Sequence, residues 1–187
     1  MLFAAPEVEA ERQRAITDVE SWSAAGYRLV TVLDEEYPSR LLEIRETPPF
    51  LFYEGSLSEP DDGVSIVGSR AASTGGLNFA AEAAEYLVSE GLTVISGLAA
   101  GVDARAHRAA LEAGGRTVAV LGTGITRSYP QANAELQREI ADRGLLLSPA
   151  PTKQSFPMRN ATMSGYGLAT VVVQAGEYSG ARIQARL

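Results

Sequence analysis

Apolar residues in this chain fall into short continuous runs and into helix-spaced series. The clearest run covers residues 64–67 and ends at the turn of residues 68–70. After it, apolar side chains recur three or four positions apart over residues 77–88, which is the spacing of one face of a helix. This stretch therefore predicts a strand, a loop rich in glycine and hydroxyl groups, and a helix.

The same order of strand, loop and helix recurs toward the C-terminus. Further strands are predicted at 92–95, 117–121, 145–147 and 169–175, and helices at 104–113, 132–143, 158–165 and 181–187. Alternating strands and helices pack as a mostly parallel sheet with helices on both faces, because right-handed crossovers leave few alternatives. The predicted fold class is therefore α/β, with a doubly wound sheet.

The N-terminal third follows a different pattern. The elements predicted there are a helix, two extended segments and a short helical piece between them, at residues 6–25, 27–33, 50–53 and 39–44 respectively. Residues 58–63 combine proline, glycine and acidic side chains, so we expect an exposed loop. We take that loop as the boundary between a short N-terminal helical appendage, residues 1–63, and the main domain, residues 64–187.

The composition is that of a soluble globular protein, with 45% hydrophobic and 21% charged residues. Cysteine is absent and there is one histidine, so we expect no disulfide, no standard metal site and no cofactor. The N-terminus lacks the basic and apolar regions of a signal peptide, and no apolar run approaches the ~20 residues of a membrane span. We expect a cytoplasmic protein without a membrane partner.

The net charge of −7 argues against a nucleic-acid partner, but the distribution of charge changes that picture. Residues 1–63 hold 5 Lys and Arg against 14 Asp and Glu, whereas residues 64–187 hold 11 against 9. Lys153 is the only lysine, and arginine is better suited than lysine to bidentate contacts with phosphate. The glycine-rich part of the chain is therefore compatible with a polyanion.

Four strand-ending loops carry glycines and hydroxyl groups. They are Gly68-Ser69-Arg70, Ser96-Gly97-Leu98-Ala99-Ala100-Gly101, Gly122-Thr123-Gly124 and Tyr178-Ser179-Gly180. In a parallel sheet these loops share one edge, where backbone N–H groups, helix N-termini and the guanidinium of Arg70 suit an anion. The alternative is that each loop is an ordinary turn in which glycine only supplies a positive φ. Their number favours an anion or nucleotide site.

Phe156, Arg159 and Asn160 form a second informative stretch, next to a proline-rich loop. An aromatic ring, a cation and an amide in this place could stack on a base, hold a phosphate and read a base edge. The alternative is that Phe156 anchors the core and Arg159 is an exposed residue at the start of a helix. The residues alone leave both interpretations open.

The sequence offers no convincing catalytic group. His107 lies four residues after Asp103 on the same side of a predicted helix, where a general base is conceivable. We favour a structural histidine near the site, with Asp103 capping its helix through backbone N–H groups. The spacings of dinucleotide-binding and ATP-hydrolysing loops are absent, as is a nucleophile elbow with a second histidine. We therefore predict no catalytic residues.

A series of motifs in order along the chain resembles one family. The motifs are Tyr37-Pro38, Gly68-Ser69-Arg70, Ser96-Gly97-Leu98-Ala99-Ala100-Gly101-Val102-Asp103-Ala104-Arg105-Ala106-His107, Gly122-Thr123-Gly124, Tyr129-Pro130, Phe156-Pro157-Met158-Arg159-Asn160 and Ser179-Gly180-Ala181. Together they resemble the DprA/Smf family of bacterial DNA-processing proteins over residues 37–187. The string that ends at His107 is the most specific of them.

This resemblance implies an extended Rossmann-like domain that binds single-stranded DNA, forms a homodimer and helps to load the RecA recombinase. It implies that the first two loops hold a DNA phosphate and that Arg159 and Asn160 line the same pocket, whereas base stacking by Phe156 is our own hypothesis. The candidate DNA- and phosphate-binding residues are Gly68, Ser69, Arg70, Ser96, Gly97, Leu98, Gly101, Gly122, Gly124, Phe156, Arg159, Asn160, Ser179 and Gly180.

The chain departs from the family pattern in ways that bear on affinity. Ala161 stands where an arginine is usual, and Pro149 stands where a glutamate is usual. The N-terminal helical domain is reduced to one predicted helix, and the chain stops about one turn into its last predicted helix, so we expect it to be truncated relative to longer relatives. With fewer cations, its DNA affinity is expected to be weaker than that of the family.

Two other function classes stay open. One is a binder or sensor of a small nucleotide, and the other is a nucleotide-processing enzyme like the related Rossmann-like phosphoribohydrolases. Those enzymes carry a Pro-Gly-Gly-x-Gly-Thr-x-x-Glu string, which is absent here. The absence favours a protein that binds nucleic acid without catalysis.

Overall fold

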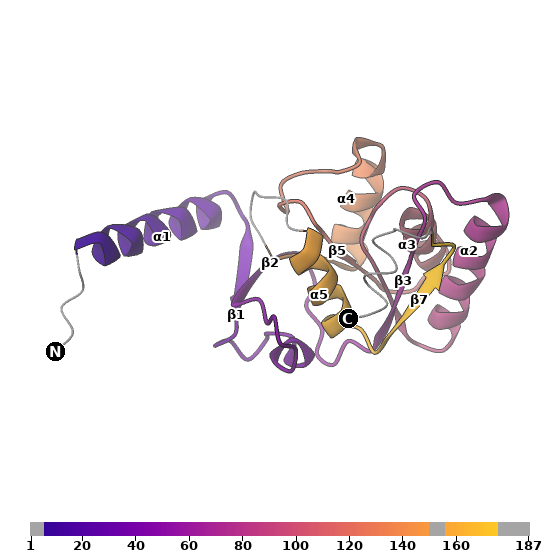
Figure 1. Ribbon diagram of the computed structural model, residues 1–187, viewed down its shortest axis with the longest axis horizontal. Helices are drawn as coiled ribbons and strands as arrows, with labels where there is room; N and C mark the ends of the chain where they lie inside the picture. Colours follow the sequence, from indigo (N-terminus) through magenta and orange to yellow (C-terminus); the bar gives the residue numbers. More distant parts are fainter. Residues whose placement is uncertain (1–5, 150–155, 176–187) are drawn as a thin grey trace.

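One β-sheet of seven strands organises the computed structural model, which describes residues 6–149 and 156–175 (Figure 1). The strands are β1 (Arg28–Thr31), β2 (Phe50–Gly55), β3 (Gly63–Gly68), β4 (Thr93–Ser96), β5 (Thr117–Val120), β6 (Leu145–Ser148) and β7 (Ala169–Val173). The helices are α1 (Pro6–Ala24), α2 (Thr74–Ser89), α3 (Val102–Glu112), α4 (Ala134–Arg143) and α5 (Phe156–Tyr166), with short 3-10 helices η1 (Ser39–Leu42) and η2 (Gln131–Asn133). The predicted elements up to residue 175 are all present, with boundaries shifted by a few residues. The helix predicted from residue 181 lies outside the described residues.

The strand order confirms the predicted α/β class with a mostly parallel sheet. Across the sheet the order is β1-β2-β6-β5-β4-β3-β7. The strands from β6 to β7 in this order are parallel, and β2 and β1 extend the sheet from β6 as antiparallel neighbours. Because β1 and β2 precede residue 63, the sheet runs across that position, and the division of the chain into two domains there stays a prediction.

Helices cover both faces of the sheet. Successive residues of a strand point to opposite faces. Leu145 and Leu147 of β6 accordingly pack in the core cluster that contains Met163 of α5, whereas Leu146 packs in the cluster that contains Ile140 of α4. α2 and α3 cover β3 and β4 on the same face as α4. The carboxyl ends of the parallel strands therefore open between α5 on one face and α2, α3 and α4 on the other.

The N-terminal helix α1 stands apart from the rest of the molecule (Figure 1). Its described side chains are exposed, except that Ile16 and Trp22 are half-buried. The indole ring of Trp22 meets Phe52 of β2 edge to face, with the ring centroids 4.9 Å apart. The predicted helix is confirmed, and Trp22 attaches its C-terminal end to the sheet.

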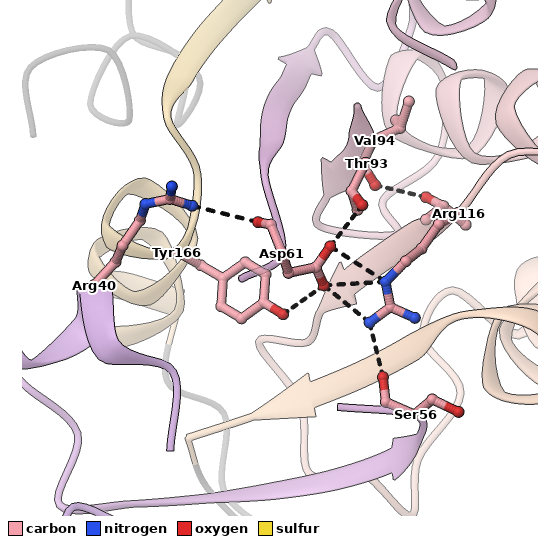
Figure 2. Close-up of polar contacts among 8 residues, drawn as sticks. Arg40, Ser56, Asp61, Thr93, Val94, Arg116 and Tyr166 are labelled. Carbon is pink, nitrogen blue, oxygen red and sulfur yellow. Dashed lines mark hydrogen bonds and ion pairs between the residues drawn. The ribbon is translucent and has the colours of Figure 1, made fainter. Parts of the chain in front are cut away.

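The loop before β3 is less exposed than its sequence predicts. Asp61 in this loop is only 6% exposed. Its carboxylate accepts hydrogen bonds from the Arg116 guanidinium at 2.9 to 3.2 Å (Figure 2). It also accepts from Thr93 Oγ1 at 2.6 Å and from the Tyr166 hydroxyl at 2.8 Å. A carboxylate with this many donors can be buried, so the expectation of an exposed loop was wrong at this residue.

These four residues, the Asp61 cluster, hold the amino ends of β4 and β5 to the end of α5. Burial alone would raise the pKa of Asp61, but the hydrogen bonds from its three partners and the charge of Arg116 outweigh burial and lower that pKa. Asp61 is therefore ionised at neutral pH. Arg116 also donates to the backbone oxygen of Ser56, which fixes the chain that leaves β2. The cluster lies at the sheet edge opposite the carboxyl ends of the parallel strands.

Candidate functional site

A pocket opens at the carboxyl ends of β3, β4 and β5. Its volume is about 100 Å³, and it is lined by Arg70, Gly97, Ala99, Ala100, Leu121, Gly122, Thr123, Tyr129, Pro130 and Arg159. These residues come from the loops that follow the three strands and from α5. This is the edge at which open α/β sheets bind their ligands. Of the predicted site residues, the structure brings Arg70, Gly97, Gly122 and Arg159 together at the wall of this pocket.

Arg159 reaches the pocket because the residue beneath it is a glycine. A Cβ at Gly97 would overlap Nη1 of the Arg159 guanidinium. Arg159 is itself buried within the fold, in contrast to Arg70, which is exposed. The alternative interpretation, in which Arg159 is an exposed residue at a helix start, is therefore wrong, and the charge of Arg159 is directed at the end of β4.

Asp103 lies beneath the same loop and has a different role from the one predicted. Its Oδ2 accepts from the backbone N–H groups of Gly97 at 3.2 Å and Ala99 at 3.3 Å. The N-cap of α3 is Gly101, which has no side chain to accept a bond. The prediction that Asp103 caps its own helix is therefore wrong. Its carboxylate instead holds the loop between β4 and α3 from inside the fold.

The charges in this region influence one another. Burial raises the pKa of Asp103, and the nearby Arg159 and the backbone N–H groups oppose that rise. Burial lowers the pKa of Arg159; the charge of Asp103 opposes this change and the charge of Arg70 adds to it. The two guanidinium groups are thus close enough to repel each other. An anion placed between them would relieve that repulsion.

The loop between β4 and α3 is held in a fixed shape. Leu98 is buried with a φ of 57°, a left-handed conformation that is uncommon outside glycine. Asn133 donates from Nδ2 to the backbone oxygen of Leu98 at 3.0 Å and to that of Ala99 at 3.4 Å. At Gly101, whose φ is 79°, a Cβ would overlap the backbone oxygen of Ser69. The loops after β3 and β4 therefore pack directly against each other.

Several predicted site residues serve the framework around the pocket and do not line it. A Cβ at Gly68 would overlap the backbone oxygen of Val173, so this glycine allows β7 to pack closely. Ser96 is buried and donates to the backbone oxygen of Ile66. Ser69 Oγ accepts from the N–H of Ala71. Those that do not line the pocket are Gly68, Ser69, Ser96, Leu98, Gly101, Gly124 and Asn160.

Three further candidates cannot be placed at the pocket. Phe156 is the first residue of α5, but its side chain lies outside the described part of the structure, so stacking by Phe156 stays a prediction. Ser179 and Gly180 lie outside the described residues altogether.

His107 lies in the core and does not face the pocket. Its Nδ1 is 2.7 Å from Thr117 Oγ1, and that hydroxyl donates its one proton to the backbone oxygen of Val94. Nδ1 of His107 must therefore be the donor to Thr117. Burial lowers the pKa of His107 to about 3, so the ring is neutral at physiological pH. Thr117 begins β5, whereas the pocket is at the other end of that strand. A structural role for His107 fits this position, but the expectation that His107 lies near the site is wrong.

Sequence reasoning missed Tyr129 as a site residue. This side chain is 52% exposed and lines the pocket beside Pro130. The available signal was an aromatic residue followed by proline, a few positions after the glycines that end β5. The position of such a residue depends on the path of its loop, so the sequence alone could not place Tyr129 at the pocket.

The described residues also limit other kinds of site. Within residues 6–149 and 156–175, no three or more acidic or histidine side chains are grouped so as to hold a metal ion. Among the helices of this part of the chain, none combines the length and the apolar character needed to cross a membrane.

Comparison with known sequences gives a consistent set of relatives. The family model for DNA recombination-mediator protein A matches residues 28–187. The chain is 40% identical over 169 residues to Protein Smf of Synechocystis, covering 85% of this chain and 42% of that protein. It is 39% identical over 185 residues to DNA processing protein DprA of Streptococcus pneumoniae, covering 95% of this chain and 65% of that protein. The chain thus spans less than two thirds of either relative.

Two solved structures have the same fold. The structure of DprA from Streptococcus pneumoniae matches with a TM-score of 0.86 and 37% identity, over 98% of this chain and 67% of that one. DNA processing protein A from Helicobacter pylori matches with a TM-score of 0.76 and 25% identity, over 86% of this chain and 74% of that one. The Helicobacter pylori structure was reported for the single-stranded DNA binding mode of that protein.

Proposed function

Because this chain belongs to the DNA recombination-mediator protein A family, also called DprA/Smf, we propose that it binds single-stranded DNA at the pocket between Arg70 and Arg159. The observation that carries the proposal is the meeting of two guanidinium groups at the carboxyl ends of the parallel strands. Two of the relatives, from Streptococcus pneumoniae and Helicobacter pylori, are named as DNA processing proteins, and the second is described as binding single-stranded DNA.

The charges of the pocket suit a phosphodiester. Arg70 and Arg159 supply two positive charges, and Asp103 beneath them supplies one negative charge when ionised. The balance is one positive charge against the single negative charge of a diester in a DNA backbone. Guanidinium groups form short, strong and often bidentate hydrogen bonds to phosphate oxygens. A phosphate between the two arginines would therefore be held by both.

The size of the pocket favours a strand over a free nucleotide. Its volume of about 100 Å³ is below the roughly 300–1,000 Å³ of pockets that enclose a small-molecule ligand. A phosphate group can enter while the sugar and base remain at the opening. That geometry suits a chain that continues across the surface.

We propose further that DNA is held without being cleaved. The buried ring of His107 is engaged by Thr117 at the opposite end of β5. Asp103 accepts two backbone N–H groups under the loop, so its carboxylate is already engaged. Neither group has the position of a general base for a phosphate in this pocket.

The strand held in this way is, in our proposal, passed to the RecA recombinase by a homodimer. The description of the family as a recombination mediator supports the transfer to RecA. The rate of RecA assembly on single strands coated with a binding protein measures the transfer, and sedimentation equilibrium measures the dimer. If the wild-type chain does not accelerate RecA assembly, the proposed transfer is overturned. If the chain is a monomer at all concentrations, the proposed homodimer is overturned.

The DNA-binding proposal is tested by competition between ligands. A fluorescently labelled oligothymidine should give a saturable rise in anisotropy that weakens steeply with salt, as phosphate contacts do. Unlabelled oligothymidine should displace it, and thymidine monophosphate at the same nucleotide concentration should not. Equal displacement by the mononucleotide would favour a small-nucleotide binder, and absence of binding to the oligonucleotide would overturn the proposal.

A further inference from the structure

We propose that Tyr129 is a stacking platform for the nucleobase next to the phosphate held by Arg70 and Arg159. This inference rests on the proposed function and deepens it, because it assigns the opening of the pocket to an unpaired base. It concerns a residue that the predicted set of site residues did not include.

The lining of the pocket divides into two chemically different parts. Arg70, in the loop after β3, and Arg159, on α5, supply positive charge. Leu121, Tyr129 and Pro130, in the segment after β5, supply apolar and aromatic surface. β4 lies between β3 and β5, so Arg70 and the apolar segment lie on either side of the loop after β4, and Arg159 packs against Gly97 of that loop. A nucleotide has the same division into an anionic phosphate and an apolar base face.

Tyr129 is more exposed than the pocket residues at the start of the same segment. Its side chain is 52% exposed, whereas Leu121 and Gly122 are buried. Exposed aromatic rings in a positively charged groove are the usual platforms for bases of single strands. The small volume of the pocket leaves the base outside the cavity proper, which is the position that a ring at the opening can meet.

The segment that carries Tyr129 is anchored on both sides. Before it, the backbone N–H of Arg127 donates to the oxygen of Gly124 at 3.0 Å, and Ser148 Oγ donates to the oxygen of Thr123 at 3.1 Å. After it, the N–H of Asn133 donates to the oxygen of Pro130 at 2.9 Å. A platform that is already held in place loses less entropy when a base binds.

Stacking has a consequence for the kind of nucleic acid that binds. Every base has an aromatic face, so a tyrosine platform accepts any of them without reading sequence. Only a base that has left a duplex exposes that face. Tyr129 would therefore contribute to preference for single strands, while the arginines would bind phosphate in either form.

The test compares two oligonucleotides of equal length and charge, oligothymidine and its abasic counterpart. The wild-type chain should bind oligothymidine about tenfold more tightly, within the range expected for one stacked base. Tyr129→Ala should reduce that ratio to near one, and Tyr129→Phe should keep it. Tyr86→Ala is the matched control, because Tyr86 is 64% exposed on α2 and does not line the pocket.

The outcomes separate this inference from the function on which it rests. If the wild-type chain binds both oligonucleotides equally, or if Tyr129→Ala keeps the tenfold ratio, the stacking role is overturned and strand binding stands. A Tyr129→Leu variant that behaves like Tyr129→Phe overturns it as well, since bulk and not an aromatic face would suffice. If neither oligonucleotide binds, both proposals fail. Circular dichroism shows that each variant is folded.

Discussion

Gly97 determines how closely a positive charge can approach the end of β4. The Arg159 guanidinium occupies the space that a Cβ at this position would need. A methyl group there must displace the guanidinium, and with it the charge that the pocket presents. The site therefore depends on the absence of a side chain at this position as much as on the presence of two arginines.

We predict that Gly97→Ala weakens binding to oligothymidine by about tenfold or more, as expected when a hydrogen bond from a charged group worth about 1.5–3 kcal/mol is lost. Fluorescence anisotropy measures the change. Gly75→Ala is the control, because Gly75 is exposed near the start of α2 and a Cβ there meets only Ser73 Oγ at 3.9 Å. Equal affinity of the Gly97→Ala variant and the wild type would contradict the role given to Arg159.

Asp103 shows where residue-level prediction stops. An aspartate at the start of a helix usually accepts from its own helix, and the sequence favours that role. In the fold, the preceding loop turns back over the carboxylate because Leu98 and Gly101 both adopt positive φ. The side chain therefore bonds to Gly97 and Ala99, which come before it. Glycine content predicts a turn but not the path of the loop.

At the scale of elements, α5 runs between the carboxyl ends and the amino ends of the parallel strands. Arg159 near its start lines the pocket, and Tyr166 at its end donates to Asp61 at 2.8 Å. The helix packs with Leu41 of η1 and against the face of the sheet that carries Leu145 and Leu147. The Asp61 cluster stabilises the fold at one end of this helix, and the pocket lies at the other end.

Tyr166→Phe should therefore lower stability without affecting DNA binding. The change removes one buried hydrogen bond to a carboxylate and leaves the ring, so we expect the free energy of unfolding to fall by about 1.5–3 kcal/mol. Urea denaturation measures it, and Tyr86→Phe at an exposed site should change it by less than about 0.5 kcal/mol. An unchanged unfolding midpoint, or a large loss of DNA affinity, would argue against this separation of roles.

The type and order of the elements were predictable because their signals are local. The apolar run at 64–67 spans four residues and the helix spacing at 77–88 spans twelve, so each signal is contained in a short stretch of sequence. Pairing is different, since the antiparallel contact of β2 with β6 joins residues about 90 positions apart. No local pattern predicts such a contact, and none predicts the hydrogen bond between Tyr166 and Asp61.

For the molecule as a whole, the buried His107 makes stability depend on pH. Its pKa is lowered by burial to about 3, whereas an unfolded histidine titrates near 6.5. Between these two pKa values, His107 binds a proton in the unfolded chain but not in the folded chain. The contribution of His107 to stability is complete above pH 6.5 and is lost, by about 1.4 kcal/mol per pH unit, as the pH falls from there toward 3.

Between pH 6.5 and pH 5 this effect amounts to about 2 kcal/mol. Because His107 is the only histidine in the chain, His107→Gln should remove that part of the pH dependence. The raised pKa of Asp103 acts in the opposite direction but equally in both proteins, so the difference between their urea curves isolates His107. Identical pH profiles for the two proteins would show that the ring is not held neutral.

The position of the pocket was predictable as a region, and its lining was predictable only in part as a set of residues. Its location follows from parallel strands, whose glycine-rich loops must share an edge. Arg70 was identified from its place in the first of these loops, and Arg159 from its stretch with Phe156 and Asn160 and from the family resemblance. The sequence could not separate residues that line the cavity, such as Gly97, from those that shape the surrounding backbone, such as Gly68 and Gly101. That distinction depends on which atoms lie where a Cβ would be.

The most direct measurement is the salt dependence of oligothymidine binding by Arg70→Ala, with Arg108→Ala as control. Both arginines are exposed, so neither change should disturb the core, but only Arg70 lines the pocket. We predict that Arg70→Ala lowers affinity about tenfold and reduces the slope of log affinity against log salt by about 0.7, the value for one phosphate contact on a single strand. Arg108→Ala should leave both unchanged. If Arg70→Ala binds with wild-type affinity and slope, the phosphate is not held at this pocket.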